Sequence, residues 1–234
     1  MACPFCGDAL GPWDTGIRPV SPGASGAYDR DETRYSICQC GGAFQNPVPT
    51  DVSLWEFYRS EYRTVCPESP TRHNKNARAR RVFPYFPQNP GDMLDVGCSV
   101  GELMELARDS GWRVEGVEPN DLGREYCQRF GAVYRSLEEV DRTFDLVTAI
   151  HVLEHIPNPV LFLRQMARVM RPDGTMLVVV PKDSIGSPHV LVMAEPQVGL
   201  LFERAGLTVT FLEAVATGNT RVDILVRAHW PLSV

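Results

Sequence analysis

The stretch LDVGCSVGE, residues 94–102, decides the fold class because it joins a short apolar run to a helical pattern through a glycine loop. The apolar run, Met93–Val96, is typical of a buried strand. The pattern after the loop, Glu102–Ser110, has the spacing of an amphipathic helix and stops at Gly111. Glycine in such a loop permits a tight turn and lets a ligand approach the main chain. The stretch therefore predicts a strand, a ligand-binding loop and a helix in succession.

The same alternation continues to the end of the chain. After the loop, we expect strands at Trp112–Val117, Phe144–Ile150 and Thr175–Val180, helices at Gly123–Phe130, Val160–Val169 and Gln197–Ala205, and β-rich runs at Thr208–Ala214 and Arg221–Ala228. Alternation of this length implies parallel strands joined by right-handed crossovers. The last two runs are joined too tightly for a crossover, through a turn at residues 217–219, and should pair as an antiparallel hairpin. We predict an α/β, Rossmann-like fold with a mostly parallel sheet and this hairpin at its C-terminal edge.

The N-terminal part of the chain has a different character. Four of the seven cysteines form two tight pairs, Cys3 with Cys6 and Cys38 with Cys40. Thiolates at these spacings can close a tetrahedral Zn²⁺ site, and four cysteines leave no open position, so the ion would be structural. Free thiols or a redox role are the alternative. We expect a zinc-ribbon-like module at residues 1–50, a helical linker and cap at 51–90, and the main domain at 91–234, with helices at Leu54–Tyr62 and Arg72–Val82.

Composition narrows the class of partner. The net charge of −6 and the pI near 5.4 argue against a partner bound mainly through phosphates, so nucleic acid is disfavoured. No apolar run approaches the roughly 18 residues of a membrane span, and the N-terminus lacks the features of a signal peptide. The sequence therefore predicts a cytoplasmic protein with no membrane partner.

The chemistry of the glycine loop points to a particular kind of ligand. A dinucleotide fingerprint reads GxGxxG, whereas this loop reads DxGxxxG and is followed by Glu102. A carboxylate there would repel a pyrophosphate but suits a cationic amino-acid ligand, whose ammonium group Asp95 could bind. Glu118 ends the next strand about twenty residues on, where a carboxylate typically binds ribose hydroxyls. The alternatives are an ordinary βα turn and a solvated surface acid.

The motifs DVGCSVG, VEGVEP, FDLVTAIHVLEHIPNP and RPDGTMLVVVP resemble, in order and spacing, those of the class I S-adenosylmethionine (SAM)-dependent methyltransferases, over roughly residues 78–234. The leader CPFCG resembles the zinc ribbon on one group of small bacterial methyltransferases. The resemblance implies that the loop residues line the methionine end of SAM, that Glu118 holds the ribose, and that residues 137 and 138 flank the adenine. The cofactor-binding residues so implied are Asp95, Gly97, Cys98, Gly101, Glu118, Pro119, Leu137, Glu138, Ile150 and His151.

Two histidines follow the strand at Phe144–Ile150, where parallel sheets carry their ligands. His151 or His155 could take the proton from a hydroxyl as its oxygen attacks the SAM methyl group. The competing interpretation is that this segment only shapes the cofactor pocket. His189, a lone loop histidine, is more typical of a surface residue.

We expect O-methylation of a hydroxylated small molecule or sugar, in secondary metabolism. An RNA methyltransferase, a non-catalytic SAM-binding protein and a nicotinamide dehydrogenase are the alternatives.

Overall fold

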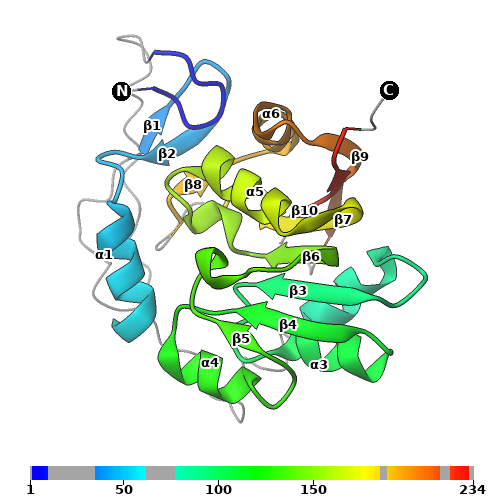
Figure 1. Cartoon of the computed structure of the whole chain (residues 1–234). Coiled ribbons are helices and arrows are strands. Elements are labelled where there is room, and N and C mark those ends of the chain that lie inside the picture. Colours follow the sequence, from blue (N-terminus) through cyan, green and yellow to red (C-terminus); the bar gives the residue numbers. More distant parts are fainter. Residues whose placement is uncertain (1, 10–34, 62–76, 185–188, 217–221, 232–234) are drawn as a thin grey trace. The chain divides into compact units, whose positions relative to one another are not determined.

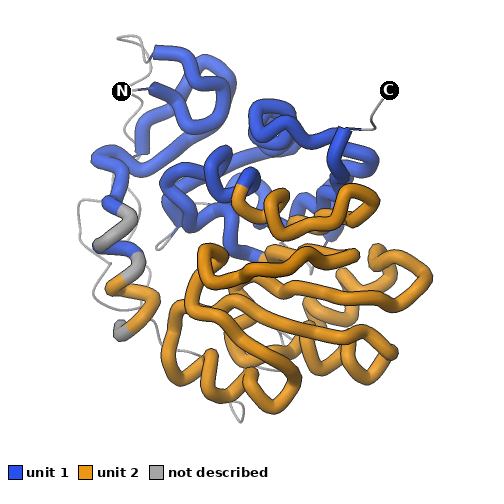
Figure 2. Tube along the Cα trace, viewed as in Figure 1, with its two compact units in different colours: residues 1–54, 151–164, 179–234 blue, residues 55–150, 165–178 orange. Residues whose placement is uncertain are grey.

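The computed structural model describes residues 2–9, 35–61, 77–184, 189–216 and 222–231 (Figure 1). It divides into two compact units, coloured in Figure 2. Unit 1 comprises residues 1–54, 151–164 and 179–234, and unit 2 comprises residues 55–150 and 165–178. The boundaries predicted at residues 50 and 90 stay a prediction. Among the residues that the structure describes, no helix has the length and apolar character needed to cross a membrane.

Unit 2 contains the strand, loop and helix expected from residues 94–102. Its strands pair in the order β5-β4-β3-β6, and all three pairings are parallel. The strands are β3 (Asp92–Val96), β4 (Arg113–Val117), β5 (Val133–Tyr134) and β6 (Phe144–Ile150), and the helices are α3 (Glu102–Asp109), α4 (Asp121–Cys127) and a 3-10 turn at Leu137–Glu139. Every residue of β3 is buried, as expected for a parallel strand covered on both faces.

Unit 1 contains the C-terminal hairpin and a small antiparallel sheet. The hairpin strands, β9 (Thr208–Ala216) and β10 (Val222–His229), pair antiparallel, which confirms that prediction; the predicted turn lies outside the described residues. The small sheet has the order β1-β2-β8, with β1 at Tyr35–Ile37, β2 at Ala43–Gln45 and β8 at Leu191–Val192. Helix α6 (Glu195–Ala205) follows β8.

Among the described residues, three elements contain residues of both units, and the first of them is helix α1 (Asp51–Glu56). Helix α5 spans Pro159–Arg168 and strand β7 spans Met170–Pro181. The strand order is β5-β4-β3-β6-β7-β10-β9, with the antiparallel pair at one edge. This order confirms the predicted α/β fold with its mostly parallel sheet.

The structure differs from the sequence prediction mainly at short elements. Strands β1, β2, β5 and β8 have two or three residues each, and a segment this short has no recognisable alternation of apolar and polar residues. Strand β7 begins at Met170 rather than at Thr175, because residues 171–174 (RPDG) are extended although their composition is typical of a turn. The helix predicted at Leu54–Tyr62 consists of α1 (Asp51–Glu56) and a π-helix at Phe57–Glu61. Of the predicted basic helix, residues 77–82 are helical and the rest lies outside the described residues.

Candidate cofactor, catalytic and metal sites

The glycine loop after β3 has a backbone that only some residues tolerate. Gly97, Ser99 and Gly101 have φ values of 76°, 54° and 79°, in the left-handed region that favours glycine. At Gly101 a side chain would also collide, since an added Cβ would lie 2.7 Å from the ring of Phe130. The loop therefore needs glycine at position 101 for conformation and for packing, as well as for any close approach of a ligand.

Glu118 is held rigidly beside this loop. Its Oε2 accepts a hydrogen bond from the Ser99 backbone N–H at 2.8 Å, and its Oε1 accepts one from the Asn120 N–H at 2.8 Å. These two hydrogen bonds position the side chain. Glu118, which is predicted to bind the ribose, therefore lies beside the loop that is predicted to bind SAM.

Asp95 lies fully buried at the end of β3. The hydroxyl of Thr148 donates a hydrogen bond to its Oδ1 at 2.7 Å. Burial raises the pKa of Asp95 to about 7; Thr148 opposes this rise, while the negative charges of Glu102 and Glu118 add to it. Three carboxyl groups thus influence one another in this part of unit 2. A cation placed among them would favour their ionised form, which agrees with a ligand that carries an ammonium group.

Cys98 was also predicted to line the cofactor. Hydrogen bonding with Cys127 and burial raise the pKa of its thiol. An added Cβ on Gly116 would lie 2.7 Å from the Cys98 sulfur, so the thiol packs against β4. A contact between Cys98 and a cofactor would therefore come from its backbone.

The other predicted cofactor residues lie on three segments. Leu137 is buried, and its carbonyl accepts a hydrogen bond from Arg168 at 2.7 Å. Glu138 is exposed, and its Oε1 accepts one from Gln165 at 2.8 Å. Pro119 and Ile150 are half-buried, one directly after Glu118 and the other at the end of β6. Their contacts with SAM stay predictions.

Sequence reasoning missed two supporting residues, Thr148 and Asn120. The side-chain oxygen Oδ1 of Asn120 caps α4 by accepting a hydrogen bond from the Gly123 N–H at 3.0 Å, a role that its place before a helix could have signalled. Its amide also donates to the backbone carbonyls of Tyr58 and Arg59 at 3.1 and 3.3 Å. These bonds tie the π-helix to the loop after β4, and nothing local in the sequence indicates them.

In unit 1, His151 lies between two carboxylates. Its Nε2 is 3.1 Å from Oδ2 of Asp223, on β10, and its Nδ1 is 3.5 Å from Oε1 of Glu154. Its φ of 56° is unusual for a non-glycine residue, and such backbone strain often marks functional positions. A carboxylate in contact with an imidazole orients the ring and stabilises its protonated form. Asp223 was not among the predicted site residues, because 72 residues separate it from His151 in the sequence.

His155 and His189 also come together in unit 1. His155 Nε2 lies 3.6 Å from Glu154 Oε1, and the rings of the two histidines are 5.0 Å apart, edge to face. His189 is half-buried, and its ring lies against that of His155. Its carbonyl accepts hydrogen bonds from the Tyr35 hydroxyl at 2.5 Å and from the Gln45 amide at 3.0 Å. Two strands of the small sheet thereby position this loop.

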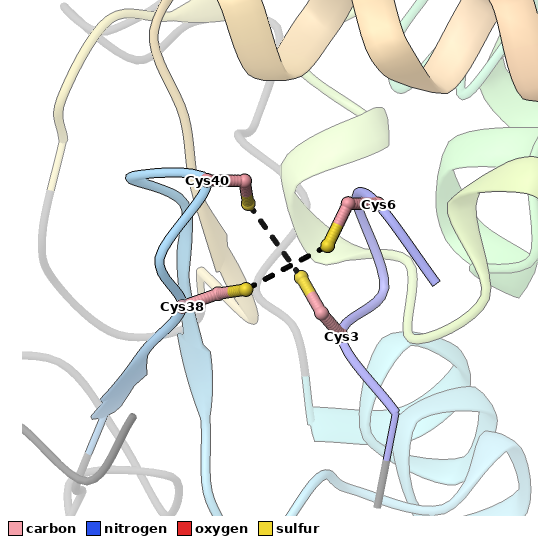
Figure 3. A group of neighbouring side chains, drawn as sticks. All are labelled: Cys3, Cys6, Cys38 and Cys40. Carbon is pink, nitrogen blue, oxygen red and sulfur yellow. Dashed lines mark hydrogen bonds between the residues drawn. The ribbon is translucent and has the colours of Figure 1, made fainter. Parts of the chain in front are cut away.

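The four cysteines of the predicted zinc site converge (Figure 3). All four sulfur atoms lie within 4.8 Å of one another, with Cys3 to Cys40 at 3.7 Å and Cys6 to Cys38 at 3.6 Å. Sulfur atoms about 2.3 Å from a tetrahedral zinc ion lie about 3.8 Å apart, so the spacing fits that ion.

The turns that present these thiols are alike. The N–H of Gly7 bonds to the Cys3 carbonyl at 3.0 Å and that of Gly41 to the Cys38 carbonyl at 2.8 Å. Both glycines have positive φ, at 83° and 87°. Burial raises the pKa of Cys40 to about 11, so in the absence of a cation this thiol stays protonated at neutral pH.

Helix α6 holds the cysteine turns in place. Arg204 donates to the carbonyls of Pro4 and Phe5 at 2.9 and 2.8 Å, and the Gln197 amide donates to the carbonyl of Cys40. The cysteine cluster is therefore anchored within unit 1 by residues distant in the sequence. Arg204 and Pro4, for example, are 200 positions apart.

Known proteins resemble this chain over part of its length. A model of the family described as "Methyltransferase domain" matches residues 71–212. A protein of Photobacterium profundum named ubiquinone biosynthesis O-methyltransferase is 35% identical over 146 residues, which cover 55% of this chain and 61% of that protein. A protein of Actinobacillus pleuropneumoniae with the same name is 30% identical over 100 residues, covering 36% of this chain and 43% of that protein. The chain thus spans less than two thirds of either relative.

Solved structures share the fold. The glycopeptide N-methyltransferase MtfA complexed with SAM matches with a TM-score of 0.56 and 14% identity, over 67% of this chain and 94% of that one. The magnesium protoporphyrin IX methyltransferase of Synechocystis, with bound SAM, matches with a TM-score of 0.57 and 14% identity, over 79% of this chain and 93% of that one.

Proposed function

This chain belongs to the class I SAM-dependent methyltransferases, and on that premise we propose that it transfers the methyl group of SAM to a hydroxyl oxygen of a small molecule. The observation that carries the proposal is the contact of His151 with Asp223 at 3.1 Å, directly after the last residue of β6. Two relatives named as O-methyltransferases support an oxygen acceptor. The acidic net charge of −6 favours a small molecule over RNA.

In this proposal the residues of unit 2 bind the cofactor. Asp95 pairs with the ammonium group of SAM, and Glu118 accepts hydrogen bonds from the ribose hydroxyls. The rigid anchoring of Glu118 by two backbone N–H groups supports its role, because a preorganised ligand loses little freedom on binding. Leu137 and Glu138 are the residues proposed to flank the adenine.

His151 is the proposed general base. SAM supplies an electrophilic methyl group on a sulfonium, so the protein needs only to align the acceptor and remove its proton. His151 takes the hydroxyl proton as the oxygen–carbon bond forms and the carbon–sulfur bond breaks, which leaves S-adenosylhomocysteine and the methyl ether. Asp223 holds the imidazole ring and stabilises the imidazolium. His155, which lies 3.6 Å from Glu154, is not the proposed base.

We infer further that the four-cysteine cluster binds a structural Zn²⁺. The convergence of four thiols, with sulfur atoms 3.6 and 3.7 Å apart, supports this inference. Hydrogen bonds from Arg204 and Gln197 join the cluster to helix α6 of unit 1. Metal analysis of the purified protein should find one zinc per chain at this site. The Cys6→Ser variant should lose that zinc, and retention of it would contradict the assignment.

The acceptor class is tested by incubating the protein with methyl-labelled SAM and a cell extract separated into metabolites and macromolecules. Label among the metabolites would support the proposal, and the labelled compound would show whether the acceptor belongs to secondary metabolism. Label in RNA, with activity falling steeply as salt is raised, would replace it by an RNA methyltransferase. SAM binding with no transfer to any fraction would favour a non-catalytic SAM-binding protein.

The base is tested on the identified acceptor with His151→Gln and Asp223→Asn. A general base contributes about 10²–10⁴-fold, so kcat should fall by that factor for His151→Gln. Asp223→Asn should lower kcat about tenfold or more. The dissociation constant for SAM should stay unchanged in Asp223→Asn, and His229→Gln is the matched control outside this cluster. Full turnover by His151→Gln would remove the base assignment.

A further inference from the structure

We propose that Glu154, His155 and His189 bind a divalent metal ion that coordinates the acceptor hydroxyl. One ligand atom from each of these residues lies within 4.8 Å of the others. The metal's role rests on the proposed function, whereas its binding does not, so the two can be tested separately. The group shares no residue with the cysteine cluster, which makes it a second metal site of different chemistry.

The spacing of the donor atoms is close to that of a bound ion. Donor atoms about 2.1 Å from a shared metal lie about 3.0–3.4 Å apart in octahedral or tetrahedral geometry. His155 Nε2 and Glu154 Oε1 are 3.6 Å apart, so a small rotation of the two side chains places both on one ion. The edge-to-face arrangement of the two imidazole rings, 5.0 Å apart, lets nitrogen atoms from both approach the same point.

A second observation supports His189 as a ligand. Its Nδ1 lies 3.0 Å from the carbonyl oxygen of Ser184, so Nδ1–H donates there and Nε2 carries the lone pair. Histidines that bind metals almost always donate their other ring N–H to a carbonyl or carboxylate in this way. The carbonyl of His189 is itself held by Tyr35 and Gln45, which fixes the backbone of the proposed ligand.

The backbone also joins the two halves of the group. The N–H of Val190 donates to the carbonyl of Glu154 at 2.8 Å, which places the residue after His189 beside the segment that carries the other two ligands. Strand β2 continues this support, because its Phe44 pairs with Leu191 of β8. The loop with His189 is thus built into the small sheet, as a preorganised metal site requires.

The burial of the group suits a bound metal ion. The Glu154 side chain is 1% exposed and that of His155 is 17% exposed, and Glu154 Oε1 lies 3.5 Å from His151 Nδ1 and 3.6 Å from His155 Nε2. One divalent ion can bind the carboxylate and both neutral imidazoles together.

The donor set indicates which ion and which acceptor. Two imidazoles and one carboxylate suit Zn²⁺, Mn²⁺ or Fe²⁺ better than Mg²⁺, which prefers oxygen alone. Three protein ligands leave about three positions on an octahedral ion, so an acceptor with two neighbouring oxygen atoms can chelate it. A hydroxyl bound to the metal loses its proton more readily, and His151, whose Nδ1 is 3.5 Å from Glu154, is the group that receives it.

Mn²⁺ is the probe, because its electron paramagnetic resonance signal distinguishes free from bound ion and it has little affinity for thiolates. The full chain, purified with zinc in its cysteine cluster, is titrated with Mn²⁺. We expect one Mn²⁺ per chain, and binding at least tenfold weaker in His189→Gln and in His155→Gln. His229→Gln, outside the group, should bind as the wild type does. SAM affinity, measured on every variant, shows that each is folded.

Absence of Mn²⁺ binding by the wild type, or equal affinity in His189→Gln and wild type, would overturn the proposal. Methyl transfer that continues at full rate after a chelator has removed the Mn²⁺ would overturn the metal's role but leave the proposed O-methylation standing. Mn²⁺ binding that His189→Gln abolishes, in a protein that methylates nothing, would support the site and contradict the proposed function.

Discussion

The binding of SAM should weaken as the pH falls through about 7, because Asp95 must be ionised to pair with the ammonium group. Burial raises the pKa of Asp95 to about 7, well above the 3.8 of an exposed aspartate. Below that pH the carboxyl group is protonated and neutral, so it offers the cation no charge. The sign follows from this: SAM affinity is full above the raised pKa and is lost as the pH falls through it.

The magnitude follows from the ionised fraction. With a pKa of about 7, roughly 9% of Asp95 is ionised at pH 6 and about 76% at pH 7.5, so the dissociation constant for SAM should be about eightfold larger at pH 6. An eightfold change corresponds to about 1.2 kcal/mol. The eightfold figure counts Asp95 alone; an α-amino group has a pKa of about 7.7–8.0, so partial deprotonation of SAM at pH 7.5 reduces the net ratio to about five- to sixfold.

Isothermal titration calorimetry at several pH values measures the affinity, and a comparison of buffers with different ionisation enthalpies counts the protons released. Near pH 7 about half a proton should leave Asp95 for each SAM bound.

Two variants isolate this residue. Asp95→Asn should bind SAM weakly and without this pH dependence. Thr148→Val removes the 2.7 Å hydrogen bond that favours the ionised carboxylate, so it should move the midpoint to higher pH. An affinity that is flat between pH 6 and 7.5 in the wild type, or a slope that Asp95→Asn leaves intact, would refute the reasoning.

The remaining predictions concern stability, measured by urea unfolding except where stated. Gly101→Ala should lower the free energy of unfolding by about 2–4 kcal/mol, since φ is 79° and the new Cβ would lie 2.7 Å from Phe130. Gly199→Ala, in a helix where an added Cβ meets nothing within 4 Å, should raise it by about 0.5–1 kcal/mol. Equal effects of the two substitutions would contradict the packing argument. Arg204→Met should lower the free energy of unfolding by about 1.5–3 kcal/mol, because two hydrogen bonds from a charged group are removed. An unchanged urea midpoint would show that these bonds do not stabilise the fold. Chelating the proposed zinc, or replacing Cys6 by Ser, should lower the Tm in a thermal scan; a Tm insensitive to both would contradict a structural metal.

Much of the main domain could be predicted because its signals are local. Strand β6 has the predicted bounds, and helix α3 ends within a residue of the predicted position, since each has a clear hydrophobic pattern with a glycine or a polar stop beside it. The C-terminal hairpin followed from the shortness of its connection, which excludes a crossover. The predicted site residues Asp95 and Glu118 needed only their offsets from the glycine loop.

Other features could not be predicted, because they depend on partners distant in the sequence. Asp223 contacts His151 across 72 residues, and Tyr35 bonds to the carbonyl of His189 across 154. Strands β1, β2 and β8 are so short that only their pairing with one another makes them strands. A lone loop histidine such as His189 has no local feature that separates a ligand from a surface residue.

The order of the elements and the class of the fold follow from the amino-acid sequence alone, and so does the prediction that the glycine loop binds SAM. These features depend on the spacing of apolar residues and glycines, a pattern that can be recognised from residues close together in the sequence. Contacts between distant side chains follow from the folded structure instead. Examples are the burial of Asp95, which raises its pKa, the carboxylates beside His151, and the proximity of Glu154, His155 and His189. Burial and contact between distant residues arise when the chain packs, and no local pattern encodes them.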